Sequence, residues 1–179
     1  ERAVRREVTQ DRGISMRLYI ETSVWNMLID ENAVNSEKRR DTEALFDEGQ
    51  QGTHELVASE LVLAEIADDP NPLHKSALEN ALKRSNARAL LANDAIIALA
   101  SEYVRESIVP ARYLDDARHI AFAVHYNLDA IISWNMAHIV KVRTRRLVRE
   151  YNVSHGLPVP DIGTPSEVIE RGHDDDTAT

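Results

Sequence analysis

The chain has 179 residues, of which 43% are apolar and 28% charged, a composition that predicts one folded domain with a substantial core. Its net charge of -9 argues against a generally basic nucleic-acid-binding protein, so any contact with nucleic acid must use a local patch. It has no cysteine, which excludes disulfides, zinc–thiolate clusters and thiol nucleophiles and fits a reducing cytoplasm.

The two ends of the chain differ in composition from its middle. Residues 1–15 are charged, show no apolar stripe and lack the apolar segment of a secretory signal. We expect them to be a flexible N-terminal extension or tag and residues 16–169 to form the domain. Residues 170–179 contain three consecutive aspartates and are predicted to be a disordered acidic tail. No apolar run is long enough to cross a membrane, and a cytoplasmic location is expected.

Strands and helices are predicted to alternate along the first half of the chain. An apolar run that begins at Arg17 ends abruptly at Glu21, which is typical of a buried strand. One helix is predicted to begin at the capping residue Ser36 and to stop at Gly49. The strands expected here are 17–21 and 54–58, and the helices are 22–29, 36–48, 59–67 and 72–84.

The second half of the chain continues this alternation. Asn93 is predicted to cap a helix whose buried face includes Ile96, Ile97 and Ala100. The strands expected are 88–91 and 129–133, the helices are 93–105, 115–126 and 134–151, and a short helical turn is expected at 164–167. Alternating strands and helices favour parallel pairing through right-handed crossovers. The predicted fold class is therefore α/β, a three-layer α/β/α sandwich with a central parallel sheet.

Two polar residues lie at the carboxyl ends of predicted strands. Glu21 ends the first strand, and Asn135 lies two residues beyond the fourth. Ligands of open α/β sheets bind outside the carboxyl ends of the strands, so both are candidates for a site. Thr22 and Ser23 supply hydroxyl groups beside Glu21. Glu21 could equally be a first-turn acid that complements a helix dipole.

Several kinds of site are excluded or disfavoured. The six glycines form neither a dinucleotide-binding motif nor a phosphate-binding loop. An aspartyl phosphatase would need an aspartate nucleophile with a second aspartate nearby. What remains is a set of oxygen donors that suits a hard divalent cation. Its members are Glu21, Glu65, Asp116 and Asn135. Each acid alone could instead cap a helix or lie on a solvated face.

Four sequence blocks resemble the PIN domain family, and within it the VapC-like toxin ribonucleases of toxin–antitoxin pairs. They are residues 19–25 (Tyr-Ile-Glu-Thr-Ser-Val-Trp), 60–66, 114–121 and 132–139. The third block, in which Asp116 directly precedes Ala-Arg-His-Ile-Ala, is the most specific. The resemblance covers residues 16 to about 167. It implies a parallel sheet that carries an acidic site, dependent on Mg²⁺ or Mn²⁺, for hydrolysis of RNA phosphodiesters.

The resemblance also implies roles for individual residues. Glu21, Glu65 and Asp116 match the metal-binding acids, and Asn135 matches a fourth position that is often aspartate. Glu21 departs from the family's usual aspartate by one methylene group, and Asn135 removes a charge, which should weaken metal binding. Thr22 or Ser23 is expected to support the first acid through a hydrogen bond. His119 and His138 receive no catalytic role.

The partners are inferred from charge and from the resemblance. Lys141, Arg145 and Arg149 recur every four residues and are expected to contact RNA phosphates, although a solvated helix face would explain them too. The family implies a cognate antitoxin protein and a homodimer. The alternative function is a PIN-like module without catalysis that binds RNA or protein.

Overall fold

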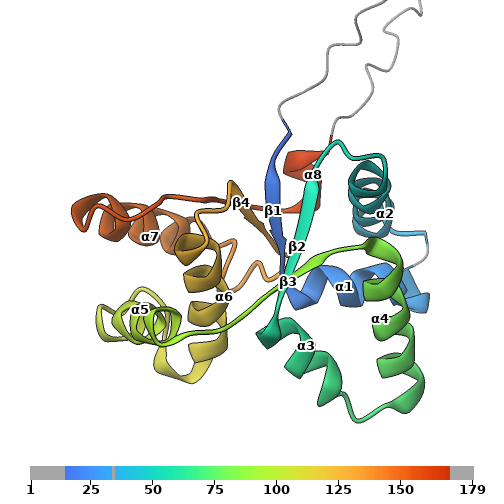
Figure 1. Ribbon diagram of the computed structural model, residues 1–179, viewed down its shortest axis with the longest axis horizontal. Helices are drawn as coiled ribbons and strands as arrows, with labels where there is room; N and C mark the ends of the chain where they lie inside the picture. The colour runs from blue at the N-terminus through green and yellow to red at the C-terminus, as the bar shows by residue number, and fades with distance from the viewer. Residues whose placement is uncertain (1–14, 34, 170–179) are drawn as a thin grey trace, which may run out of the picture.

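The computed structural model describes residues 15–33 and 35–169. The predicted acidic tail lies outside the described residues. The predicted N-terminal extension also lies outside them, except for Ser15. The chain folds around a five-stranded sheet of order β3-β2-β1-β4-β5 in which all neighbours are parallel (Figure 1). The elements are β1 (Arg17–Ile20), α1 (Thr22–Ile29), η1 (Glu31–Ala33), α2 (Glu37–Gln50), β2 (Glu55–Ser59), α3 (Glu60–Ala67), α4 (Pro72–Ser85), β3 (Arg88–Leu90), α5 (Asp94–Arg105), η2 (Ala111–Tyr113), α6 (Leu114–His125), β4 (Ala130–Ile132), α7 (Val142–Ser154), β5 (Asp161–Gly163) and α8 (Pro165–Val168).

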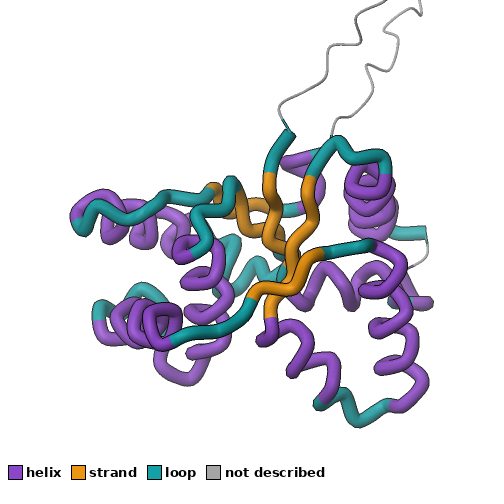
Figure 2. The backbone as a smooth tube through the Cα atoms, viewed as in Figure 1, coloured by secondary structure: helices purple, strands orange, loops and turns teal. Residues whose placement is uncertain are grey.

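Helices cover both faces of the sheet, which confirms the predicted fold class. Helices α5, α6 and α7 lie on one side and α1, α2 and α4 on the other (Figure 1), and Figure 2 shows the strands between them. The central strand β1 pairs with β2 and β4, and its Leu18, Tyr19 and Ile20 are fully buried. A strand covered on both faces is apolar at consecutive positions, which explains the apolar run before Glu21. No helix within the described ranges is both long and apolar enough to span a bilayer.

Three predicted helix starts are confirmed by their caps. The side chain of Ser36 accepts a hydrogen bond from the backbone N–H of Arg39, and Asn93 accepts one from Ile96. Ser59 caps α3 in the same way through the N–H of Val62. These side chains satisfy backbone donors that the first turn of a helix leaves free.

Gly49 does not stop α2, contrary to the prediction. The helix continues to Gln50, and the chain turns at Gly52, whose φ of 78° favours glycine. A Cβ atom at Gly49 would lie 2.5 Å from Cδ1 of Leu56 in β2. The glycine therefore lets α2 approach the sheet closely.

The region after β4 also differs from the prediction. Residues 136–139 form a turn, and α7 begins at Val142 instead of near Trp134. Strand β5 was not predicted; it has three residues and pairs with β4 through Ala130 opposite Asp161. On α5, Ile97 is 48% exposed, so the predicted buried face was wrong at that position.

Candidate functional site

The fold brings the four predicted oxygen donors to one edge of the sheet. Glu21 follows β1 and Asn135 follows β4, and the carboxyl ends of these neighbouring parallel strands meet at the same edge. Glu65 lies in the second turn of α3, which continues from β2, and Asp116 lies in the first turn of α6. The short α3 and the start of α6 therefore place their acids beside the strand ends.

Hydroxyl groups hold the carboxylate of Glu21, which is only 6% exposed. Its Oε2 accepts hydrogen bonds from the Oγ of Ser133, at 2.7 Å, and from the Oγ of Ser23. Each serine hydroxyl also accepts a hydrogen bond from a backbone N–H. The Oγ of Ser133 accepts from Asn135 at 2.9 Å, and the Oγ of Ser23 accepts from Trp134 at 2.8 Å. Each hydroxyl thus links Glu21 to the turn that follows β4.

Glu65 is joined to a buried histidine. The His119 Nε2 lies 3.3 Å from Oε2 of Glu65 and 4.0 Å from Oε1 of Glu21, and Thr22 donates its hydroxyl to Glu65. Burial opposes ionisation of Glu65, but the hydrogen bond from His119, the charge of His119 and the hydroxyl of Thr22 outweigh it and lower the pKa of Glu65. Glu65 is therefore an anion beside Glu21.

His119, to which the sequence analysis gave no catalytic role, lies between the acids. It is 1% exposed, and its Nδ1 lies 2.7 Å from the Tyr19 hydroxyl. Burial lowers the pKa of His119, but the hydrogen bond with Glu65 and the charges of Glu21, Glu65 and Asp116 raise it above its ordinary value overall. The three acids therefore favour protonation of His119.

Asp116 has one oxygen paired and one free. Its Oδ1 accepts a hydrogen bond from Nδ2 of Asn135 at 3.1 Å, whereas its Oδ2 is buried without a hydrogen-bond partner. Burial raises the pKa of Asp116 and the charge of Glu21 adds to this, while His138 and His119 act in the opposite direction. A buried unpaired carboxylate oxygen is costly and commonly marks a functional position.

Asn135 presents its amide nitrogen to the acids, not its oxygen. The Oδ1 accepts the backbone N–H of His138 at 3.1 Å, and a backbone N–H can only donate, so the opposite amide group must face Asp116. The sequence led us to expect Asn135 as an oxygen ligand. In this arrangement it positions Asp116 and stabilises the turn before α7.

The donor chemistry fits a hard divalent cation, although the side chains do not form a closed cage. No group of three or more His, Asp or Glu side chains in residues 15–33 and 35–169 is arranged so that it could hold a metal ion. Three carboxylates nevertheless lie around His119, and Asp116 offers a buried oxygen without a partner. Carboxylate oxygens in this environment are the ligands that Mg²⁺ and Mn²⁺ prefer.

The three predicted RNA-binding residues have different surroundings. Arg145 donates to both carboxylate oxygens of Glu167, at 3.0 and 3.2 Å, and to the carbonyl oxygen of Val140. These contacts engage its guanidinium within the fold. Lys141 and Arg149 are exposed, and Arg149 lines a shallow hollow on α7 with Arg146 and Val153.

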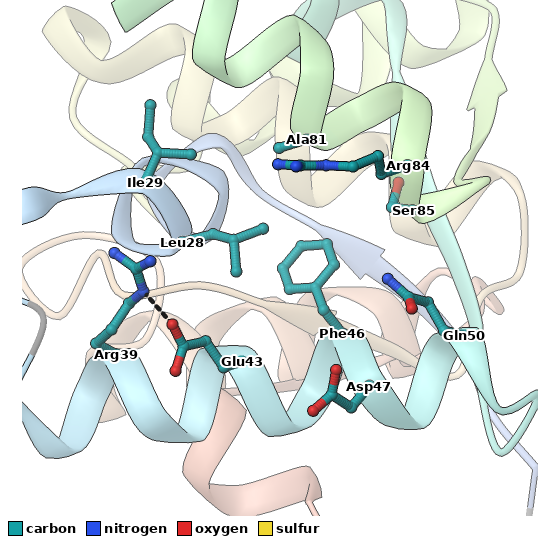
Figure 3. A pocket seen from close by; sticks show the side chains of 10 residues that line it. All are labelled: Leu28, Ile29, Arg39, Glu43, Phe46, Asp47, Gln50, Ala81, Arg84 and Ser85. Carbon is teal, nitrogen blue, oxygen red and sulfur yellow. Dashed lines mark hydrogen bonds and ion pairs between the residues drawn. The ribbon is translucent and has the colours of Figure 1, made fainter.

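Two further hollows lie on the side of the sheet that carries α1, α2 and α4. One, of about 790 Å³, reaches the acidic cluster because Ser23 and Trp134 line it. The other, of about 340 Å³, lies between α1, α2 and α4, with Leu28 and Phe46 near the ion pair of Arg39 with Glu43 (Figure 3). The second hollow contains none of the predicted site residues.

Comparison of the sequence with models of known protein families and with curated proteins finds no match.

Proposed function

We propose that the protein is a metal-dependent endoribonuclease of the PIN family, related to the VapC-like toxins. The observation that supports this best is the grouping of Glu21, Glu65 and Asp116 around His119. These acids come from three of the sequence blocks that resemble the family, and they lie at the edge of the sheet where α/β proteins bind ligands. Three clustered carboxylates repel one another unless a cation balances them.

In this proposal the three acids would hold Mg²⁺ or Mn²⁺, which when bound supplies an acidified water and neutralises charge on the phosphate. Ser23 and Ser133 hold Glu21 in place, and Thr22 does the same for Glu65. Asn135 donates its amide to Asp116 and leaves the second oxygen of that carboxylate available. The protein's own part is thus to hold three carboxyl groups at one edge of the sheet.

The remaining parts of the proposal concern partners. Lys141 and Arg149 would contact RNA phosphates, since both are exposed and follow Asn135 closely in the chain. A cognate antitoxin protein would inhibit the enzyme in the cytoplasm. We also propose a homodimer, for which Ile97 and Leu73 offer exposed apolar side chains, 48% and 84% exposed.

A second candidate function is a PIN-like module that binds RNA or protein without catalysis. It is favoured by two features of the described residues: the acids do not form a complete metal-binding group, and the oxygen of Asn135 is occupied by His138. Under this alternative the acidic cluster would be balanced by His119 alone.

Cleavage of single-stranded RNA in the presence of Mg²⁺ or Mn²⁺ separates the two candidates. We expect wild-type cleavage to disappear in EDTA and Asp116→Asn to reduce the rate at least about a hundredfold, since a ligand of the cation is lost. Asp115→Asn is the matched control, because the adjacent Asp115 is exposed and pairs with Arg118 at 2.7 Å. Cleavage that survives EDTA, or that Asp116→Asn leaves unchanged, would contradict the proposal.

A further inference from the structure

We propose that a groove along α7 binds the chain's own acidic tail, residues 170–179, which thereby covers Arg149. The groove consists of two adjoining hollows of about 530 and 490 Å³ that share Arg146 and Arg149, and we call it the α7 groove. Binding of the tail is independent of the proposed function. Only its consequence for RNA rests on that function, in which Arg149 contacts phosphates.

The α7 groove combines apolar side chains with cations. Val142, Val159 and Ile162 line the first hollow and Val153 lines the second, and three arginines share the first hollow with one acid, Asp161. The strand that supplies Ile162, β5, is at the edge of the sheet. Exposed apolar surface that is bordered by polar groups is typical of an interaction site.

The exposed face of α7 has the same composition. Val142, Arg146, Arg149 and Val153 follow one another at intervals of four, three and four residues, which places them along one face of the helix. The two valines are 80% and 63% exposed. Two arginines thus lie between two uncovered apolar side chains, a pattern that suits an extended segment whose negative charge is in its middle.

The arginines in the middle of this face have charge left for a ligand. Arg146 lies 3.5 Å from Glu150, but both side chains are more than 60% exposed, and such pairs are weak. Arg149 forms no ion pair with any residue in the ranges 15–33 and 35–169. The α7 groove therefore favours an anionic ligand.

The acidic tail has the complementary charge. It contains Glu170 and the three consecutive aspartates Asp174, Asp175 and Asp176, against one arginine, Arg171. No other run of three acids occurs in the sequence. Opposite charges of this kind attract the two segments and orient one against the other.

The tail also begins close to the groove. Glu167 of α8 accepts a hydrogen bond at 3.0 Å from Arg145, which itself lines the first hollow. The tail begins three residues after Glu167. Five extended residues, the separation of Ile169 from Asp174, span about 17 Å, whereas Arg149 lies one turn, about 6 Å, beyond Arg145 along α7. The aspartates can therefore reach Arg149 without a change in the described fold.

A tail bound in this way competes with RNA. Its carboxylates and the phosphates of an RNA would use the same cation, Arg149, so that under the proposed function the tail weakens RNA binding. The competition is electrostatic, and salt screens it.

A disulfide between introduced cysteines tests the position of the tail in the full chain, which has no cysteine of its own. Thr177→Cys is combined with Val153→Cys in the groove, or with Leu73→Cys as the matched control. Leu73 is 84% exposed on α4, on the other side of the sheet (Figure 1). Under mild oxidation of dilute protein, we expect the pair with Val153 to form its disulfide at least about tenfold faster, because binding raises the effective concentration of the tail.

The charges are tested in the same two proteins. Changing all three aspartates of the tail to Asn, or making Arg146→Gln with Arg149→Gln, should lower the rate for Val153 to that for Leu73. Sodium chloride at about 1 M, where the Debye length is about 3 Å, should do the same without any further substitution. The rate for Leu73 should change little in each case.

Binding of a short fluorescein-labelled RNA in EDTA measures the consequence without cleavage. We expect the protein with all three tail aspartates changed to Asn to bind about tenfold more tightly than wild type at low salt, with a smaller difference at high salt. The control combines Asp68→Asn, Glu79→Gln and Asp94→Asn, which alter net charge equally at exposed positions outside the groove. This control should raise the affinity much less.

The outcomes separate this inference from the proposed function. Equal disulfide rates for Val153 and Leu73, or a rate for Val153 that neither salt nor the aspartates affect, would overturn the inference and leave the nuclease intact. Disulfides that join two molecules would also overturn it, because the tail would then occupy the groove of a second copy. RNA affinity that the tail aspartates leave unchanged would contradict the covering of Arg149. A bound tail in a protein that never cleaves RNA would support the inference and overturn the proposed catalysis.

Discussion

The amide of Asn135 is held in one orientation by its two neighbours. The His138 N–H fixes its oxygen, so its Nδ2 faces the Oδ1 of Asp116 at 3.1 Å. A carboxylate in the same place would bring two anionic oxygens together. The amide therefore reduces repulsion in a cluster that already contains Glu21 and Glu65. In the proposed metal site it also supplies one negative charge fewer than a carboxylate would.

Asn135→Asp should accordingly have opposite effects with and without metal. We expect the free energy of unfolding in EDTA to fall by about 1–3 kcal/mol, because a hydrogen bond is replaced by repulsion. We expect Mg²⁺ to bind more tightly, because the added carboxylate supplies charge. Urea denaturation and calorimetric titration measure the two effects, and the exposed Asn32→Asp is the control. Unchanged Mg²⁺ affinity would mean that Asn135 does not belong to a metal site.

The places of Glu21 and Asn135 at the ends of strands could be predicted from sequence, but their contacts could not. Glu21 and Asn135 are recognisable because each follows an apolar strand, and strand ends of a parallel sheet converge. The orientation of Asn135 depends on the turn at His138, which begins where a helix was predicted. His119 was given no catalytic role from the sequence, and the packing of α6 against Tyr19 places it beside Glu21 and Glu65.

At the scale of elements, local signals predicted the capped helices and four of the five strands, but not the edge strand β5 or the start of α7. The caps Ser36, Ser59 and Asn93 each act through a residue three positions away, so the sequence alone reveals them. Strand β5 has three residues, too few for a periodic pattern, and it depends on pairing with β4. Gly49 was read as a stop signal because its contact with Leu56, in another element, is invisible in the sequence.

Gly49→Ala tests that contact. Alanine would gain about 1 kcal/mol in helix propensity, but its Cβ would lie 2.5 Å from Cδ1 and 2.6 Å from Cγ of the buried Leu56. Overpacking of this kind costs about 1–3 kcal/mol, so we expect net destabilisation in urea unfolding. Combining Gly49→Ala with Leu56→Val should recover part of the loss relative to Leu56→Val alone. Greater stability of the single Gly49→Ala variant would show that α2 moves away from β2 without cost.

At the scale of the whole molecule, the short helix α8 ties the two helical layers together across the β5 edge. Ser166 donates to Asp41 of α2, and Glu167 accepts from Arg145 of α7. Glu167 also accepts the backbone N–H of Thr164 at 2.7 Å, which completes the cap of α8. Arg145, which the sequence suggested for RNA binding, therefore helps to hold α7 against α8.

The ion pair of Arg145 with Glu167 predicts a pH-dependent contribution to stability. The hydrogen bond from Arg145, opposed by partial burial and aided by Thr164, lowers the pKa of Glu167 below its ordinary 4.5. A carboxyl whose pKa is lower in the folded state stabilises the fold above its unfolded pKa, and this contribution is lost as the pH falls through the folded value. Because Arg145 and Glu167 are 33% and 49% exposed, the contribution should be no more than about 1 kcal/mol.

We expect Glu167→Gln to lower the free energy of unfolding by up to about 1 kcal/mol near pH 7 and by less near pH 3, because the contribution of the charged carboxylate declines below the ordinary pKa of 4.5. Urea unfolding of both proteins at the two pH values measures the difference. Glu150→Gln serves as the control, because Glu150 pairs with Arg146 of the same helix at 3.5 Å, and both side chains are more than 60% exposed. An equal loss at both pH values would assign the effect to packing of α8 and not to the charge that joins it to α7.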